Sequence, residues 1–295
     1  FAKISTLIEI CINNCPELVS LNNLHHHSTL RSIKLLDCPR LEFLLDKQLP
    51  NIINVTIDGI YRFGPELVDL CHAVDPSFRE LIIQGYQDRS FPNWVGNYYA
   101  SFSNVVKVTI SNCIRCNRFP PLGQLPSLEH LYISKMDQIR RVGREFYGGD
   151  HGAFLRLETL VFCDMPEWEE WQVADGAFSK LRDLRIYDCP KLRNFQLITP
   201  PLTPASKHPS FPSLSELHIC DLPSLKSVSI PNLSNLRELR ISECLELASV
   251  HGLQGISSLE TLFLVGCPKL KYPLDEQLPS TLKFVNINDI YVLPK

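Results

Sequence analysis

Apolar side chains recur along this chain in a pattern that fits neither a helix nor a simple alternating strand. In residues 181–192 (LRDLRIYDCPKL) they lie at offsets 0, 3, 5, 8 and 11, as Leu181, Leu184, Ile186, Cys189 and Leu192. Offsets 3 and 5 alternate as in a short strand with one buried face. Offsets 8 and 11 predict that the chain then turns and brings two more side chains back inward. The same phrase occurs at 7–18, 30–41 and 259–270.

The phrase repeats along the whole chain. We count twelve copies, and their offset-3 residues cover 275 positions in eleven steps, a mean spacing of 25. These residues are Ile10, Ile33, Val55, Leu81, Val108, Leu131, Leu160, Leu184, Leu217, Leu239, Leu262 and Val285. A period of about 20–29 residues is typical of a leucine-rich-repeat solenoid. We therefore predict an α/β-type solenoid, a horseshoe of about twelve irregular repeats. Parallel strands should line its concave face, and loops or 3₁₀ turns its convex face.

The spacing between copies also bears on domain organisation. A solenoid of 295 residues needs no single large core, because each coil packs only on its neighbours. Longer spacings mark insertions at 58–77, 87–104, 143–154 and 198–213, which should project from the edge or the convex side. Because the repeat resumes after each insertion, we predict one domain over 1–295. The pattern is already running at Phe1, so we expect a fragment of a longer protein.

Cysteine occupies offset 8 in half of the copies. The six residues are Cys15, Cys38, Cys113, Cys189, Cys244 and Cys267. A thiol is a small apolar group that can make weak hydrogen bonds to the turning backbone. We therefore predict a buried cysteine ladder, with no disulfides, in a protein from a reducing compartment. A proline often follows and should end the strand ladder, since it lacks an N–H group.

Composition removes several function classes. Apolar residues make up 44% and charged residues 21% of the chain, as in folded domains. The net charge of −3, without a dense Lys/Arg block, gives no reason to expect a nucleic-acid partner. No apolar run approaches the length of a membrane span.

Longer phrases in the middle of the chain point to one family. They are Phe91-Pro92-Asn93-Trp94, 119–128 (FPPLGQLPSL), 145–148 (EFYG) and 165–171 (MPEWEEW). Together with the Cys-Pro ladder, they resemble the repeat domain of plant intracellular disease-resistance proteins. The resemblance is to the coiled-coil, nucleotide-binding, leucine-rich-repeat class, and it covers essentially the whole chain.

The resemblance implies a function and its partners. It suggests the ligand-sensing and autoinhibitory domain of a plant immune receptor, which recognises a pathogen effector directly or through a guarded host protein and triggers defence. Its other partners would be the receptor's own nucleotide-binding and coiled-coil modules. The expected location is the cytoplasm, with or without the nucleus. The chain lacks a G-x-x-x-x-G-K-[ST] motif, so ADP or ATP is expected only in the nucleotide-binding module and no cofactor here.

The concave face is where we expect the binding site. Side chains at offset 4 should point to solvent, because strand side chains alternate. This column reads Cys11, Lys34, Thr56, Ile82, Thr109, Tyr132, Val161, Arg185, His218, Arg240, Phe263 and Asn286. Exposed aromatic and arginine residues are typical of protein-binding hot spots. The candidate partner-binding residues are Ile82, Tyr132, Val161, Arg185, Tyr187, His218, Arg240 and Phe263.

A plainer interpretation of the basic stripe Arg185, His218 and Arg240 stays open. Acidic residues flank it on both sides, at Asp183, Glu216 and Glu238 and at Asp188, Asp221 and Glu243. The stripe could thus be a self-neutralised, solvated ladder that contributes little.

Other chemistry has weaker support. The pair Cys113-x-x-Cys116 could be half of a zinc site, but no second pair follows at a suitable spacing. The run 25–27 (HHH) more plausibly lies in an exposed return, so we predict no metal site.

An acidic and aromatic cluster at 167–171 (EWEEW) resembles a carbohydrate-cleaving site, but its tryptophans can equally cover a repeat edge. We therefore predict no enzyme. The alternative function is a substrate adaptor of a ubiquitin ligase or another protein-binding scaffold. An extracellular receptor would need paired capping cysteines, which we do not find.

Overall fold

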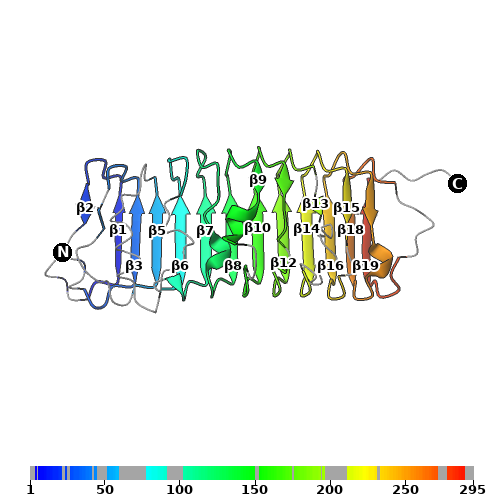
Figure 1. Ribbon diagram of the computed structural model, residues 1–295, viewed down its shortest axis with the longest axis horizontal. Helices are drawn as coiled ribbons and strands as arrows, with labels where there is room; N and C mark the ends of the chain where they lie inside the picture. The colour runs from blue at the N-terminus through cyan, green and yellow to red at the C-terminus, as the bar shows by residue number, and fades with distance from the viewer. Residues whose placement is uncertain are drawn as a thin grey trace.

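Twelve short strands form one parallel sheet along the molecule (Figure 1). The structure is a computed structural model that describes residues 4, 6–21, 24, 27–41, 43–44, 52–59, 78–91, 102–149, 153–174, 176–193, 195–196, 211–230, 233–271 and 278–289. In spatial order the strands are β1 (Glu9–Asn13), β3 (Ser32–Leu36), β5 (Asn54–Asp58), β6 (Glu80–Gln84), β7 (Lys107–Ser111), β8 (His130–Ser134), β10 (Thr159–Cys163), β12 (Asp183–Tyr187), β14 (Glu216–Cys220), β16 (Glu238–Ser242), β18 (Thr261–Val265) and β19 (Phe284–Asn288).

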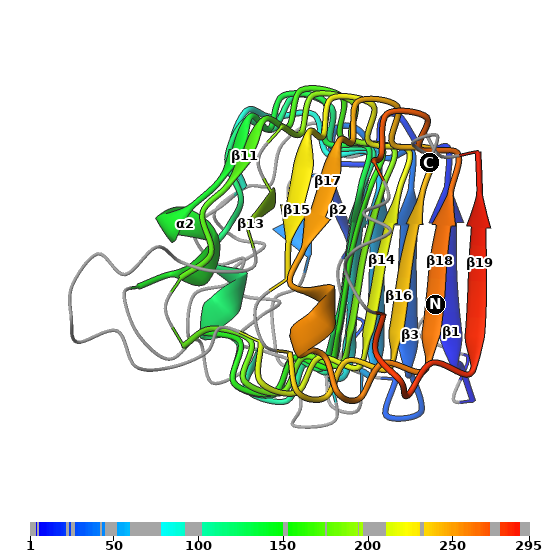
Figure 2. The same cartoon turned by 90° about the vertical axis from the view of Figure 1, so that its right-hand side faces the viewer.

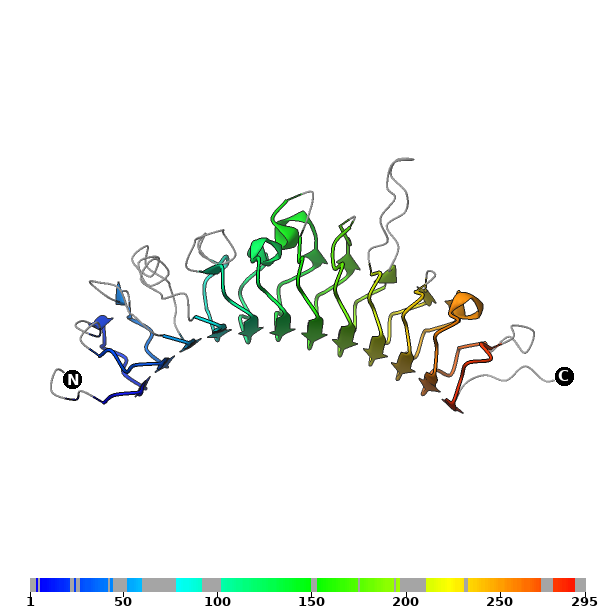
Figure 3. The same ribbon diagram turned by 90° about the horizontal axis from the view of Figure 1, so that it is seen from below.

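The strands pair in the register that the repeats predict. Ile10 lies opposite Ile33 at one end of the sheet, and Leu262 lies opposite Val285 at the other. Viewed along the strands, the molecule is an arc with the sheet on its inner side (Figure 3). This confirms the predicted leucine-rich-repeat solenoid with parallel strands on the concave face. The single-domain assignment over 1–295 stays a prediction.

Burial alternates along most strands. In β12, Leu184 and Ile186 are fully buried, while the side chains on either side of them are half-buried. The pattern weakens at β19, where Val285 at offset 3 is 44% exposed. The other eleven offset-3 residues are buried, and all of them except Ile10, on the first strand of the sheet, have a neighbouring strand on each side.

Each residue of the cysteine ladder lies two residues beyond the end of a strand of the main sheet. The structure buries Cys38, Cys113, Cys189, Cys244 and Cys267 and leaves Cys15 half-buried. Each of the six thiols donates a weak hydrogen bond to the carbonyl oxygen two residues earlier, over 3.1 to 3.5 Å. Burial raises the pKa of the Cys38, Cys113 and Cys189 thiols, to about 12 for Cys113, so these three stay protonated donors. All ten described cysteines are free.

A left-handed residue at offset 7 turns the chain in all twelve repeats. Its φ angle lies between 50° and 66°. The twelve residues are Asn14, Asp37, Gly59, Gly85, Asn112, Lys135, Asp164, Asp188, Asp221, Glu243, Gly266 and Asp289. Asn, Asp and Gly tolerate this conformation best, and they fill ten of the twelve positions. In the first eleven repeats the backbone amide of this residue donates to the next coil, as from Asp188 to the Cys220 oxygen at 3.1 Å.

The convex side carries short elements (Figure 2). Three small parallel sheets contain β2 (Ser20–Leu21) and β4 (Phe43–Leu44); β9 (Arg141–Val142) and β11 (Glu170–Trp171); and β13 (Phe195–Gln196), β15 (Ser227–Ser229) and β17 (Ser249–His251). The helical segments described are α2 (Arg144–Tyr147), η3 (Leu122–Gln124) and η4 (Leu253–Gly255). We predicted loops and 3₁₀ turns here, and the short strands are an addition. Element α2 places the start of the 143–154 insertion on this side. Most of the other three insertions lies outside the described residues.

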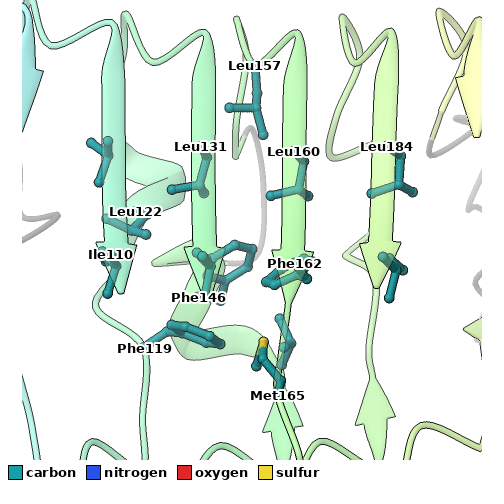
Figure 4. Close-up of a cluster of buried hydrophobic side chains, with 14 of the residues drawn as sticks. Ile110, Phe119, Leu122, Leu131, Phe146, Leu157, Leu160, Phe162, Met165 and Leu184 are labelled. Atoms are coloured by element: carbon teal, nitrogen blue, oxygen red, sulfur yellow. The ribbon is translucent and has the colours of Figure 1, made fainter. Parts of the chain in front are cut away.

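An aromatic block fills the core between the sheet and the convex side (Figure 4). Its rings are Phe119, Phe146, Tyr147, Phe154, Phe162, Trp168, Trp171, Phe178 and Phe211. The ring centroids of Phe146 and Phe154 are 4.8 Å apart, as are those of Phe162 and Trp168. Most of these residues come from the phrases that carry the family resemblance, and their role here is packing.

Candidate functional site: the concave face

The offset-4 side chains form one continuous row across the sheet. Val161 lies opposite both Tyr132 and Arg185, and the pairing continues in both directions. Tyr187 lies in the adjacent column, between Cys163 and Cys220. All eight candidate partner-binding residues are therefore on the same face. The structure brings them together in strand order, as the repeat pattern implies.

The first part of the row is mildly apolar. It comprises Ile82, Thr109, Tyr132 and Val161, all half-buried, on β6 to β10. Beside it, the Lys107 ammonium is 2.7 Å from a Glu80 oxygen and 5.7 Å from the Tyr132 ring centroid. The hydrogen bond that Lys107 donates to Glu80 raises the pKa of Lys107 and keeps it charged.

Arg185 begins the basic stripe and is held by its own strand. Its Nε donates to both Asp183 oxygens, at 2.8 and 3.0 Å. A terminal guanidinium nitrogen is also 3.8 Å from Glu216 on the next strand. The Asp183 hydrogen bond raises the pKa of Arg185 further. Only 18% of the Asp183 side chain is exposed, so this pair is partly shielded from solvent.

The stripe continues as a chain of contacts through His218. Its Nε2 is 2.9 Å from Glu238, and its Nδ1 is 3.5 Å from the Tyr187 hydroxyl. Glu238 also accepts a hydrogen bond from Arg240, and these two donors lower the pKa of the Glu238 carboxyl, Arg240 more than His218.

Two aromatic rings lie at the end of this chain of contacts. The Arg240 guanidinium lies 3.9 Å from the Phe263 ring centroid, within cation–π range. Phe263 in turn packs against Phe284 at 5.0 Å.

One of the two flanking acidic columns therefore neutralises the stripe. Within the described residues, no ion pair joins Asp188, Asp221 or Glu243 to it. These three occupy the left-handed turn, which is a backbone role that our sequence reasoning missed. The signal was present as an Asn, Asp or Gly directly before most ladder positions. Burial, then the neighbouring Asp164 and Asp221, raise the pKa of the Asp188 carboxyl.

The acidic and aromatic cluster at 167–171 does not form an open site. Trp168 is fully buried and Trp171 is 5% exposed, so both rings belong to the core. Glu167 pairs with Lys191 at 2.5 Å, and Glu170 pairs with Arg141 at 3.3 Å. The carboxylates thus bridge neighbouring coils rather than face an aromatic platform.

The two potential metal sites also have structural roles. Cys116 is buried and donates to the Asp88 oxygen at 3.1 Å, while Cys113 is a ladder residue. His27 is 3% exposed, contrary to the exposed return that we expected, because its Nδ1 is held 2.9 Å from the Ile4 oxygen. His25 and His26 lie outside the described residues. Across the described ranges, no three His, Cys, Asp or Glu side chains converge as a metal site would require.

None of the helical segments in the described part of the chain could span a bilayer. The fold and its repeating register define the class: the chain is a leucine-rich-repeat protein. More particularly, about half of the chain is similar in sequence to plant disease-resistance proteins. Residues 71–136 match the family described as R13L1/DRL21 LRRs.

Similar proteins carry disease-resistance names. At3g14460 of Arabidopsis thaliana is 37% identical over 156 residues, which are 50% of this chain and 10% of that protein. The RPP13-like protein 1 of Arabidopsis thaliana is 37% identical over 152 residues, 48% of this chain and 13% of that protein. RGA2 of Solanum bulbocastanum is 28% identical over 146 residues, which are 44% of this chain and 15% of that protein. The chain thus matches only a small part of each relative's length.

Among solved structures, the leucine-rich repeat domain of the type III effector XopL is similar in fold. It is 16% identical, with a TM-score of 0.47, and the match covers 80% of this chain and 69% of that one.

Proposed function

We propose that this chain is the ligand-sensing and autoinhibitory domain of a plant intracellular immune receptor. The observation that carries the proposal is the continuous concave row of aromatic, apolar and basic side chains, on repeats related to those of disease-resistance proteins. Its role is to bind proteins, without catalysis and without a cofactor of its own. ADP or ATP belongs to the receptor's nucleotide-binding module, and the location is the cytoplasm.

The proposed mechanism is competition for the concave face. In the resting receptor, this face contacts the nucleotide-binding or coiled-coil module and favours the inactive state. A pathogen effector, or a host protein that the effector modifies, takes the same face and shifts the equilibrium. A ligand shifts an equilibrium only through different affinities for the two states, with a typical coupling of about 1–3 kcal/mol.

The test is binding between this chain and the nucleotide-binding module of the same receptor, co-expressed as separate chains. A variant with Tyr132→Ala, Arg185→Ala and Arg240→Ala changes both halves of the concave row. Lys269→Ala is a matched control, because Lys269 is exposed outside the concave row and pairs with Glu246. We expect the wild type and the control to bind and the triple variant to lose binding.

Two results would argue against the proposal. Equal binding by the triple variant would mean that resting contacts lie elsewhere on the solenoid. Absence of binding by every form would remove the autoinhibitory role and favour a scaffold or adaptor function.

A further inference from the structure

The concave face divides by charge into two parts. On β12 to β18, the basic side chains of the central row are already engaged: Arg185 with Asp183 and Glu216, and both His218 and Arg240 with Glu238. A partner carboxylate that approached these side chains would compete with partners that are already in place. Breaking a shielded pair leaves one charge uncompensated, so such contacts yield little net affinity.

The middle of the face differs. We call the half-buried residues Thr109, Ser111, Tyr132, Ser134, Thr159, Val161 and Cys163, on β7, β8 and β10, the neutral zone. Two other side chains face outward on these strands. Lys107 is paired with Glu80, and His130 Nδ1 is 3.3 Å from the Thr159 hydroxyl. The neutral zone therefore has an aromatic ring at its centre and hydroxyl groups around it, and the Lys107 cation beside it is already paired with Glu80.

We propose that the neutral zone is the anchoring site for an uncharged protein segment that carries an aromatic side chain, with Tyr132 as its main contact. This inference rests on the proposed protein-binding function and specifies the chemistry of the partner. The Tyr132 ring and Val161 offer apolar area whose burial breaks no ion pair. The surrounding hydroxyls can donate to or accept from a peptide backbone. Aromatic residues surrounded by neutral contacts that exclude water are the usual composition of binding hot spots.

Charge complementarity argues against other occupants. A phosphate backbone requires several available cations, and Lys107 is already held by Glu80. An acidic segment has no unpaired cation to meet in the neutral zone. A basic segment would meet no carboxylate within the neutral zone, and on the flanking strands Glu80 and Asp183 are already paired, with Lys107 and Arg185 respectively.

The test is a selection of short random peptides, displayed on phage, against the immobilised 295-residue chain. We expect the enriched peptides to be uncharged and to contain Trp, Tyr or Phe. Their affinity should fall about tenfold or more on Tyr132→Ala and stay unchanged on Lys269→Ala. Because no charge is used, raising NaCl from about 0.1 to 0.5 M should change their affinity less than about twofold.

A second variant separates binding from folding. Thr109→Arg keeps the Tyr132 ring and places a charge inside the neutral zone, so it should also abolish binding while the thermal midpoint stays near that of the wild type.

Enrichment of acidic peptides whose binding weakens strongly with salt would overturn the inference. So would peptides that bind Tyr132→Ala as well as the wild type, or a selection that enriches none. Binding to the nucleotide-binding module is a separate readout, so failure of the proposed function is distinguishable.

Discussion

At the scale of the residue, the ladder position holds a buried side chain that needs few hydrogen-bond partners. A cysteine thiol meets this requirement because its weak donor reaches the carbonyl two residues earlier, as Cys189 does over 3.1 Å to Tyr187. Met136, Met165 and Leu222 occupy the same position in other repeats and are also fully buried. The position therefore requires a buried apolar side chain, and the thiol hydrogen bond is a further contact that forms where this residue is cysteine.

A carboxylate at this position should be strongly destabilising. Cys189→Asp is expected to lower the free energy of unfolding by about 3 kcal/mol or more, because it buries an unpaired charge. The urea midpoint measures this effect. Cys220→Asp is the matched control, since Cys220 is half-buried on the concave face. Equal midpoints for both variants would mean that the ladder is not inside.

The left-handed turn is the other residue-level constraint. Gly85 has a φ of +64°, and an added Cβ would lie 2.6 Å from an Asp58 oxygen and 2.9 Å from the Gly59 nitrogen. We expect Gly85→Ala to cost about 1–2 kcal/mol, measured by thermal or urea unfolding. Asn112 occupies the same turn position one strand further along the sheet, and Asn112→Gly should be close to neutral. A harmless Gly85→Ala would show that the turn can change its backbone conformation.

At the scale of the element, each strand and turn is repeated by its neighbour, so like residues stack. Carboxylates follow one another in the turns after β10, β12, β14 and β16, at Asp164, Asp188, Asp221 and Glu243. The backbone does not require this charge, because Asn or Gly fills the same position elsewhere. The stack therefore has an electrostatic cost without a structural need.

This cost gives a pH dependence. The pKa of Asp188 is raised in the folded protein above its ordinary value of 3.8, so its charge opposes folding at neutral pH. Asp188→Asn should therefore raise the thermal midpoint at pH 7. The difference from the wild type should shrink as the pH falls through the raised pKa and vanish below the ordinary value. A difference that grows on acidification would contradict this assignment.

The sequence predicted the concave strands better than the convex side. Offsets 3, 5 and 8 alone placed all twelve strands in register, because a repeated core position leaves one way to stack the coils. The short convex strands, such as β9 and β11, were not predictable, since two residues carry no periodicity. The candidate row was placed on one face by alternation. The contacts that engage Arg185 and Arg240 depend on side-chain geometry, which alternation does not determine.

At the scale of the whole molecule, stability should accumulate from contacts between neighbouring coils rather than from one centre. The aromatic block should be a large local contribution, since its ring contacts join the coils from Phe119 to Phe211. Phe162 is fully buried there, and we expect Phe162→Ala to cost about 3–5 kcal/mol, as measured by urea unfolding. Phe263→Ala, on the concave face, should cost much less. Similar losses for both would mean that the block is not the core.

The register itself is the central claim, because it decides which side chains are inside and which can meet a partner. Alkylation of the native chain with iodoacetamide, followed by mass spectrometry, tests it on ten cysteines at once. Fast modification is expected at the exposed Cys11, with the half-buried Cys15, Cys163 and Cys220 intermediate. Protection until denaturant is added is expected at the buried thiols Cys38, Cys113, Cys116, Cys189, Cys244 and Cys267. If the ladder cysteines react as fast as Cys163 and Cys220, the coils are stacked in another register and the concave row is not the surface described above.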